Sequence, residues 1–521
     1  MRVRSPLPPL DSASLDAHFS TFALARGRAE PDKVALIDAA ADRQLTFGEL
    51  TAAIDAVAGG LRAQGLAPGD IVALCAFNCI EYVVAAHAVW RAGGVVVTVN
   101  PLFTVGEMHT ELVDAGARVC IAAAEVSQRV AASARLASIE RVYSLEALPT
   151  AAPPPAPSAE PDATALILYS SGTTGLPKGV ELTHRNLNAS LLQLYAGDLA
   201  RPTDVLLALS PFFHVVGLHG VMNLGLFAGS GIVILARYDL PRLLGAIQRY
   251  AISSIFITPP VLTDLAKHPA VDGYDVSSLR SILCAAAPLG ADLEQMAADR
   301  LGCVVRQGYG MTEASGPVST NLVDQDGQIR RRGSVGQLVP STECKIVDLA
   351  TGAELEPGDA GEVLVRGPQV MKGYLGQPEA TRISLEADGW LHTGDVGYAD
   401  AEGYLYIVDR VKEIIKYKAY QVAPAELEAV LMTHAGVRDA AVVPVPDPES
   451  GEIPKALVVR SADNVAADEL LAYVAERVAP YKKVRRIEFV ESIPKSPSGK
   501  ILRRLLVERE RAAAAQSAQA S

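Results

Sequence analysis

The chain has 521 residues, enough for roughly two to four domains of ordinary size. Hydrophobic residues make up 49% of it and charged residues 20%, which is typical of a globular protein and too apolar for a disordered one. With 47 Lys and Arg against 59 Asp and Glu, the formal net charge is −12, which argues against a partner bound through a nucleic-acid backbone.

The six cysteines are scattered, and only Cys75 and Cys79 lie close together. This spacing excludes a zinc ribbon and a dense disulfide scaffold and fits a reducing compartment. The most apolar stretch, residues 83–99, is interrupted by His87, Arg91 and two glycines, so it falls short of the ~20 apolar residues of a membrane span. The N-terminus lacks the apolar core of a signal peptide. We therefore expect a cytoplasmic protein without a membrane span.

The first part of the chain, up to about residue 145, alternates helical and strand patterns. Thr46 and Glu49 form a capping box, which predicts that a helix begins there. The apolar runs 71–75 and 94–99 are typical of buried strands, with about a dozen helical residues between them. This βαβ order predicts a parallel sheet. Residues 148–161 are rich in Pro and Ala, so we predict a linker-like loop.

A second alternating stretch runs from Leu166 to about residue 335. Between residues 336 and 408 the pattern changes to short strands punctuated by Gly and Asp, which predicts a small β-rich subdomain. A charged segment and an α+β unit follow. We therefore divide the chain into an N-terminal domain, 1–408, and a C-terminal domain, 409–521. Residues 511–521 have no partner pattern, and we expect this tail to be disordered.

Residues 169–180, YSSGTTGLPKGV, form a glycine-rich loop after a predicted buried strand. Glycines permit close backbone approach, and hydroxyls, backbone N–H groups and Lys178 can bind phosphate oxygens. The loop is therefore suited to the phosphates of a nucleotide, with a polar surface turn as the alternative. It is not a Walker A loop, because Gly179 follows Lys178 where that motif has Ser or Thr.

Four more motifs follow in order: QGYGMTE at 307–313, GWLHTGD at 389–395, DRVKEIIKYKAYQVAPAELE at 409–428 and PKSPSGKILRR at 494–504. Together with the loop they resemble the acyl-adenylate-forming (AMP-binding) superfamily, most closely its 4-coumarate:CoA ligase-like branch. The resemblance implies an α/β fold. A large N-terminal domain would contain two αβα subdomains and a small β-barrel, and a smaller, mobile C-terminal α+β domain would follow.

The resemblance also implies an acyl-CoA synthetase, which uses ATP and Mg²⁺ to activate a carboxylic acid as acyl-AMP and then transfers the acyl group to coenzyme A. A carboxylate is already ionised at pH 7, so such an enzyme needs no general base but must offset charge and align the attack. Alternatives are an adenylation enzyme that loads an acyl carrier protein, a luciferase-like oxygenase and a non-catalytic relative. The family contains monomers and homodimers, and the sequence does not choose.

By the same resemblance, Lys500 would bridge the acyl carboxylate and the α-phosphate, and His214 would border that carboxylate. Lys416 would act in a second conformation, and Asp395 would accept the ribose hydroxyls. The predicted ATP and AMP site comprises Ser170, Ser171, Gly172, Thr173, Thr174, Gly175, Lys178, Gln307, Gly308, Tyr309, Gly310, Thr312, Asp395, Arg410, Gln421 and Lys500.

Mg²⁺ would be held by Glu313 and Thr174, because a hard cation prefers oxygen ligands.

Relatives that act on hydroxycinnamates carry Tyr where this chain has Val216, and this departure favours a less polar acid, such as cinnamate or a medium-chain acid. Ala285 replaces a Gly and would narrow the pocket. The predicted acyl pocket comprises His214, Val216, Ala285, Ala286, Gly308, Gly310 and Met311.

Coenzyme A would contact Arg237, Lys418 and Ala419, and the C-terminal domain would rotate about a hinge at Lys412. The family usually has Gly at position 419. A Cβ there would crowd the pantetheine arm, which favours the carrier-protein alternative.

Overall fold

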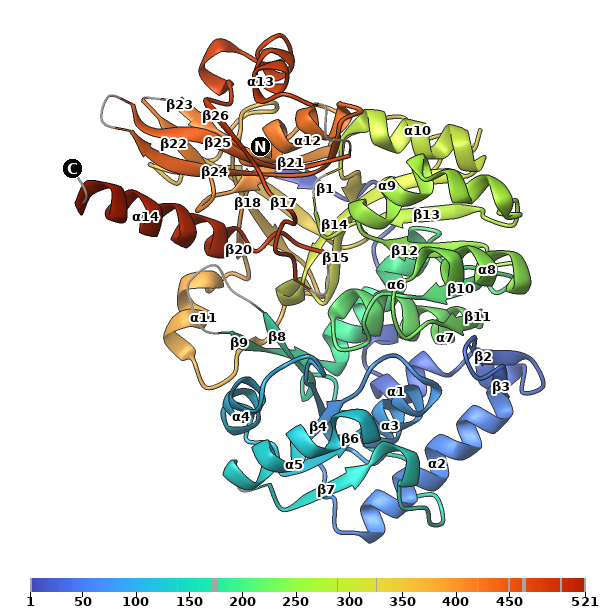
Figure 1. Ribbon diagram of the computed structural model, residues 1–521. Coiled ribbons are helices and arrows are strands. Elements are labelled where there is room, and N and C mark those ends of the chain that lie inside the picture. The colour runs from blue at the N-terminus through green and yellow to red at the C-terminus, as the bar shows by residue number, and fades with distance from the viewer. Residues whose placement is uncertain are drawn as a thin grey trace.

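The computed structural model describes residues 2–137, 139–158, 160–170, 177–287, 289–324, 326–418, 420–447, 450–461, 465–496 and 499–519. Within these ranges the strands form four sheets, one of seven strands, one of nine and two of five. In Figure 1 the seven-stranded sheet lies at the bottom and the sheet of the C-terminal residues at the top.

The seven-stranded sheet contains the predicted parallel βαβ unit. Strands β4 and β5 pair in parallel on either side of helix α3 (Ile80–Arg91) in the chain. The predicted capping box is present, and helix α2 (Phe47–Ala63) begins directly after it. The order is β19-β9-β8-β5-β4-β6-β7. The strands are β4 (Ile71–Cys75), β5 (Val95–Thr98), β6 (Val119–Ala122), β7 (Arg141–Ser144), β8 (Thr164–Ser170), β9 (Lys178–Thr183) and β19 (Gly373–Tyr374).

The nine-stranded sheet, in the order β16-β15-β14-β13-β12-β10-β11-β2-β3, collects strands from distant parts of the chain. Strand β2 belongs to the first 50 residues, yet its Leu36 pairs with Ile232 of β11. Periodicity in a sequence reveals a strand but not its neighbour. The strands are β2 (Val34–Asp38), β3 (Arg43–Thr46), β10 (Val205–Ala208), β11 (Gly231–Ile234), β12 (Ser254–Ile257), β13 (Ser281–Cys284), β14 (Val304–Met311), β15 (Gly316–Thr320) and β16 (Gln337–Leu338).

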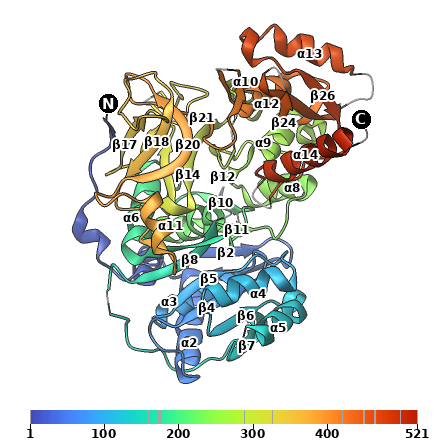
Figure 2. The same cartoon turned by 90° about the vertical axis from the view of Figure 1, so that its left-hand side faces the viewer.

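The β-rich region forms an antiparallel sheet in the order β1-β17-β18-β20-β21. Its edge strand β1 comes from the N-terminal end of the chain, which lies beside β17 and β18 in Figure 2. Beyond this order, Leu405 of β21 also bridges Gly336, directly before β16, and the expected small barrel remains a prediction. The strands are β1 (Arg2–Arg4), β17 (Glu343–Val347), β18 (Gly361–Arg366), β20 (Leu391–Ala399) and β21 (Leu405–Arg410).

The C-terminal sheet has the order β23-β22-β25-β24, with β26 beside β25. Helix α14 continues to Gln519, so most of the tail that we expected to be disordered is helical; its alanine-rich sequence has a high helix propensity. The elements are β22 (Ile415–Tyr417), β23 (Tyr420–Val422), α12 (Pro424–Thr433), β24 (Val437–Asp447), β25 (Gly451–Arg460), α13 (Ala467–Ala475), β26 (Arg486–Phe489) and α14 (Arg503–Gln519).

None of the helices in the described ranges is both long and apolar enough to cross a bilayer. The remaining α-helices are α1 (Phe19–Ala23), α4 (Val105–Asp114), α5 (Ser127–Leu136), α6 (His184–Ala196), α7 (Leu224–Ala228), α8 (Leu240–Tyr250), α9 (Pro259–Lys267), α10 (Ala291–Leu301) and α11 (Pro378–Ser384).

The predicted loop at residues 148–161 has neither helix nor strand in its described part. It packs tightly on α2, where a Cβ on Gly60 would lie 1.9 Å from the carbonyl oxygen of Pro149. The Arg91 guanidinium donates to the carbonyl oxygens of Pro154 and Pro155, both at 2.8 Å. The loop is therefore fixed against helices α2 and α3.

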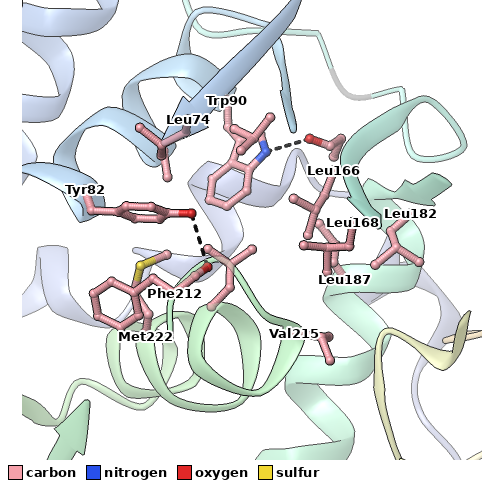
Figure 3. Close-up of a cluster of buried hydrophobic side chains, with 14 of the residues drawn as sticks. Leu74, Tyr82, Trp90, Leu166, Leu168, Leu182, Leu187, Phe212, Val215 and Met222 are labelled. Carbon is pink, nitrogen blue, oxygen red and sulfur yellow. Dashed lines mark hydrogen bonds between the residues drawn. The ribbon is translucent and has the colours of Figure 1, made fainter. Parts of the chain in front are cut away.

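A buried apolar cluster, drawn in Figure 3, lies between the two large sheets and supports the segment that begins at Phe212. Tyr82 donates its hydroxyl hydrogen to the Phe212 carbonyl oxygen at 3.2 Å, and the Trp90 indole donates to the Ala165 carbonyl oxygen at 2.7 Å. Directly after this anchored segment the chain forms a π-helix, η5 (Val216–Asn223). Such helices are rare and often occur at functional sites.

Buried neutral histidines hold η5 in place. His219 Nε2 donates to the Leu187 carbonyl oxygen at 3.1 Å, and the Asn223 carboxamide lies between His219 Nδ1 at 3.5 Å and His87 Nε2 at 3.0 Å. Burial lowers the pKa of both His87 and His219 to about 3. Each ring therefore stays neutral, with its proton on Nε2.

Replacing His219 with Gln should make the stability of the protein less sensitive to acid. The unfolded chain protonates its histidines near pH 6.5, whereas folded His219 does not, so its contribution is complete above pH 6.5 and falls as the pH drops toward 3. The free energy of unfolding should therefore fall less steeply in His219→Gln, by up to about 1.4 kcal/mol per pH unit. Urea unfolding from pH 4.5 to 8 measures this. Equal slopes in the two proteins would contradict it.

Candidate active site

The stem of the glycine-rich loop is closed by two paired strands, with Ser170 at the end of β8 opposite Lys178 at the start of β9. The Ser170 hydroxyl donates to Glu313 Oε1 at 2.9 Å, and the Tyr374 hydroxyl donates to the same oxygen at 3.1 Å. The Lys178 ammonium lies 4.8 Å from the centre of the Tyr374 ring. The structure thus brings buried Glu313 to the mouth of the loop. The predicted loop residues 171–175 lie outside the described residues.

Asp395 lies at the centre of a second group. The Tyr309 hydroxyl donates to Asp395 Oδ2 at 2.5 Å, and Arg410 Nε lies 3.2 Å from Oδ1. Asp395 and Arg410 face each other across β20 and β21. Burial raises the pKa of Asp395, and the Arg410 charge opposes that rise. Burial and the Asp395 charge raise the pKa of Tyr309 far above its ordinary value, so Tyr309 remains a donor.

Removing the Tyr309 hydroxyl should weaken ATP binding selectively. Tyr309→Phe deletes a hydrogen bond to a buried carboxylate, a loss of about 1.5–3 kcal/mol, so the KM for ATP should rise about 10- to 100-fold while the KM for the acid stays within about twofold. Initial rates of pyrophosphate release measure both constants. The control is Tyr398→Phe, on the strand β20 that carries Asp395, where the Tyr398 ring stacks on Tyr406. Equal rises in the two constants would contradict this role.

Lys500 joins these two groups from the C-terminal part of the chain. Its charge acts on Asp395, Glu313 and His214, which belong to three different segments of the chain. Burial, and next the nearby charge of Arg410, lower the pKa of Lys500 to about 8. The Lys500 ammonium is therefore buried within electrostatic reach of Asp395, Glu313 and His214.

His214, a predicted acyl-site residue, lies within reach of the Lys500 charge. Its Nδ1 accepts the backbone N–H of Val216 at 3.3 Å, which fixes the ring at the start of η5. Burial and the Lys500 charge lower the pKa of His214 to about 4, so the ring is neutral at pH 7. Val216, the second predicted acyl residue, is the first residue of η5.

The other predicted acyl residues lie at the ends of neighbouring strands. Ala285 follows β13 and donates its N–H to the Ile257 carbonyl oxygen at 3.1 Å. Ala286 has a φ of 73°, a left-handed conformation that is uncommon for a residue with a Cβ. At Gly310 a Cβ would lie 1.8 Å from the Gly316 carbonyl oxygen, so only glycine fits. Gly308 lies two residues earlier on β14, and Met311 ends this strand.

The side chain of Gln307 differs from our expectation for a nucleotide ligand. It donates to Glu294 Oε2 at 2.7 Å, and Glu294 is fully buried and also binds Arg332 at 3.1 Å. The Gln307 carboxamide is thus used to tie β14 to α10. Thr312 begins the short 3₁₀ helix η7 (Thr312–Ala314), directly before Glu313.

The structure does not bring the predicted C-terminal residues of the second conformation to Lys500. Lys412 is exposed in the turn after β21, and Lys416 is exposed on β22, opposite Gln421 on β23. Lys418 has a φ of 54°, and its N–H donates to the Ser450 carbonyl oxygen at 2.8 Å. Within the described residues, no hydrogen bond or ion pair connects the side chain of Lys412, Lys416 or Lys418 to Asp395. Position 419 lies outside the described residues.

The predicted coenzyme A contact Arg237 lies on the surface. Its guanidinium stacks over the Phe77 ring at 4.4 Å and lies 3.7 Å from Glu125. The charge is therefore exposed but partly balanced.

Sequence reasoning missed Tyr374, which binds Glu313 from 61 positions further along the chain. It lies outside every motif, so no local signal marks it. It also missed buried Arg503, although this arginine belongs to the last motif. Arg503 ties that motif to Glu413, which follows the predicted hinge, at 2.8 Å.

Comparison with known proteins identifies the family to which the chain belongs. A 4-coumarate–CoA ligase of Oryza sativa is 42% identical over 491 residues, 91% of each chain. The structure is similar to that of anthranilate CoA ligase AuaEII with anthranoyl-AMP, with a TM-score of 0.89 and 26% sequence identity over 97% of this chain and 100% of that one. It is also similar to Bacillus subtilis o-succinylbenzoate coenzyme A synthetase with ATP and magnesium, with a TM-score of 0.82 and 31% identity over 93% of this chain and 99% of that one. Residues 24–375 match the AMP-binding enzyme family and residues 426–500 its C-terminal domain. The chain therefore belongs to the AMP-binding enzyme family.

Proposed function

We propose that the protein is an ATP-dependent acid–CoA ligase that forms AMP and pyrophosphate. The observation that carries this proposal is the position of Lys500, whose charge reaches both the Asp395 group and His214. One cation thus lies between a ribose acceptor and the acyl side. The similarity to the rice 4-coumarate–CoA ligase and to anthranilate CoA ligase supports the same reaction class.

In the first step the acid's carboxylate oxygen bonds to the α-phosphorus of ATP, and the bond to the β-phosphate bridging oxygen breaks, releasing pyrophosphate. Asp395 and Arg410 hold the ribose, and Lys500 offsets the negative charges that meet. In the second step the thiol sulfur bonds to the acyl carbon, AMP leaves with the bonding electrons, and the thiol proton passes to solvent. Neutral His214 lines the acyl side without adding charge.

Glu313 fits a role as Mg²⁺ ligand. Its carboxylate is buried, and the Ser170 and Tyr374 hydroxyls both donate to Oε1, so that within the part of the chain that the structure describes Oε2 is left to bind a cation. Magnesium bound there would neutralise charge on the triphosphate. Thr174, the second ligand that we propose, would complete the site from the loop.

The acid that we propose is a cinnamate- or 4-coumarate-like aromatic acid or a medium-chain fatty acid. Val216 offers no hydrogen-bond partner for a ring hydroxyl, which favours the less polar members of this class. Coenzyme A is the proposed acceptor, with Arg237, Lys418 and Ala419 as contacts and Lys412 as the hinge. An acyl carrier protein is the second candidate, favoured by the Cβ at position 419.

Ala285→Gly should widen the acid pocket. Removing one methyl from a wall at the end of β13 should raise kcat/KM for acids with a larger ring by about 10-fold, the usual discrimination for one methylene-sized group. Rates with a series of ring-substituted cinnamates measure this, with unsubstituted cinnamate as the internal control. No gain for any bulky acid would contradict the assignment of Ala285 to the pocket wall.

The experiment that tests the function is pyrophosphate release from ATP with a panel of cinnamates, benzoates and C4–C16 fatty acids, with and without coenzyme A. Products are identified by mass. Turnover that requires coenzyme A and yields an acyl-CoA supports the ligase and names the acid. Release that stalls near one equivalent with or without coenzyme A would support a carrier-protein acceptor instead. No release with any acid would reject the proposed reaction.

A further inference from the structure

The Lys500 side chain is carried by a small hairpin whose base is fixed to the C-terminal sheet. Lys495 and Ile501 form a bridge at the base, and the Lys495 ammonium binds Asp439 of β24 at 2.8 Å. Near the tip, Gly499 donates its N–H to the Ser496 carbonyl oxygen at 2.8 Å. The bridge and the ion pair therefore fix the base of the segment that carries Lys500 to this sheet.

Gly499 of this segment faces Thr258, at the end of a strand of the nine-stranded sheet. Thr258 directly follows β12, and Ala285 of the proposed acyl wall directly follows the neighbouring strand β13. A Cβ on Gly499 would lie 2.9 Å from Thr258 Oγ1 and 3.2 Å from Thr258 Cβ. Contacts of this length do not admit a methyl group. Gly499 also has a φ of 79°, which favours glycine.

The Thr258 side chain is not used to cap its own helix. Thr258 is the N-cap residue of α9, a position where Thr commonly accepts a backbone hydrogen bond, but its side chain accepts none here. Pro259 and Pro260 follow, and neither has an N–H to donate. The side chain instead forms the surface on which the glycine rests.

We propose that Thr258 is a positioning residue for adenylation, a seat on which Gly499 rests so that the adjacent Lys500 reaches the reacting groups. The contact between Gly499 and Thr258 connects the C-terminal sheet with the nine-stranded sheet. It therefore acts only while the segment that carries Lys500 lies against the end of β12. The inference rests on the proposed function, because it assumes that Lys500 serves acyl-AMP formation. It adds a residue outside every motif of the sequence.

Two half-reactions separate this role from a general loss of structure. Gly499→Ala should lift the hairpin tip by a few tenths of an ångström or more and lower the rate of acyl-AMP formation about 100-fold. Thioester formation from supplied acyl-AMP should stay within about twofold, because that step does not use Lys500. Thr258→Ala removes Oγ1 and Cγ2, leaves a gap beneath the tip and should lower acyl-AMP formation about 10-fold.

The double variant Thr258→Ala with Gly499→Ala is the decisive measurement. The new methyl group occupies the space left by the threonine, so acyl-AMP formation should recover at least about 10-fold over Gly499→Ala alone. Recovery supports the seat. Additive losses, or normal adenylation in Gly499→Ala, would overturn it.

Gly69→Ala controls for backbone strain. Gly69 has nearly the same φ, 81°, but a Cβ there would meet nothing within 4 Å. Its adenylation rate should equal that of the wild type. If instead Gly69→Ala loses as much adenylation as Gly499→Ala, strain explains the effect and the seat is rejected. Failure of the underlying function is distinguished by Lys500→Ala: unchanged adenylation in that variant would reject the role of Lys500 itself, whatever happens at Thr258.

Discussion

Lys500→Ala should abolish acyl-AMP formation and spare the second half-reaction. The ammonium is the cation of the C-terminal part that acts on both Asp395 and His214, and removing such a preorganised charge costs about 100- to 1,000-fold in rate. Thioester formation from supplied acyl-AMP and coenzyme A should stay within about twofold of wild type. Single-turnover pyrophosphate release and thioester mass measure the two steps.

The pH profile gives this prediction a second readout. Because burial lowers the pKa of Lys500 to about 8, the ammonium loses its proton as the pH rises past that value, and adenylation should decline above pH 8. Arg504→Ala is the control, since its side chain is exposed and pairs only within α14. Equal loss of both half-reactions in Lys500→Ala would contradict the assignment.

Arg503→Met should strongly destabilise the C-terminal part of the chain. The buried guanidinium binds both carboxylate oxygens of Glu428, the Glu413 carboxylate at 2.8 Å and the Val442 carbonyl oxygen at 2.5 Å. Glu428 is itself buried and accepts the Val442 N–H at 2.6 Å. Removing the cation leaves this carboxylate uncompensated, so the free energy of unfolding should fall by about 3–5 kcal/mol.

Urea unfolding of the full chain measures the loss, and the neighbouring arginine is the matched control. Arg504→Met removes an exposed pair with Glu508 and should cost about 0.5 kcal/mol or less. Adding Glu428→Gln to Arg503→Met removes the stranded charge and should recover part of the stability. If the two arginine variants were equally stable, the buried network would not hold this part of the fold.

The elements that local chemistry specifies were predicted best from the sequence. The capping box at Thr46 and the parallel pair around α3 depend on residues close together in the chain, and both are confirmed. The placement of β2 in the nine-stranded sheet and of β1 at the edge of the β-rich sheet depends on strand neighbours, which periodicity does not encode. The helical end of α14 was not predicted, because residues 511–519 lack an apolar pattern that would pack on the rest of the fold, although their alanines have a high helix propensity.

For the candidate site, too, the sequence located residues within local motifs but not residues that act through contacts between distant segments. Motifs located Lys500, Asp395, Arg410 and Glu313, and the structure brings these groups together. Tyr374 and Thr258 lie outside the motifs, because their roles arise from contacts between distant segments. Gln307 lies inside a motif, and its side chain is engaged by the buried Glu294 carboxylate, a contact that the motif alone does not reveal.

The first strand of the chain has a consequence for the order of folding during synthesis. Arg2 of β1 pairs with Lys345 of β17, β2 pairs with β11, and β19 returns to the first sheet beside β9. Strands β1 and β2 therefore cannot reach their final partners until the later segments that carry β17 and β11 have left the ribosome. Non-local pairing of this kind slows folding and leaves strand edges open for longer. A nascent chain stalled before residue 343 should thus hold its N-terminal end accessible to protease, and one extended past residue 410 should protect it.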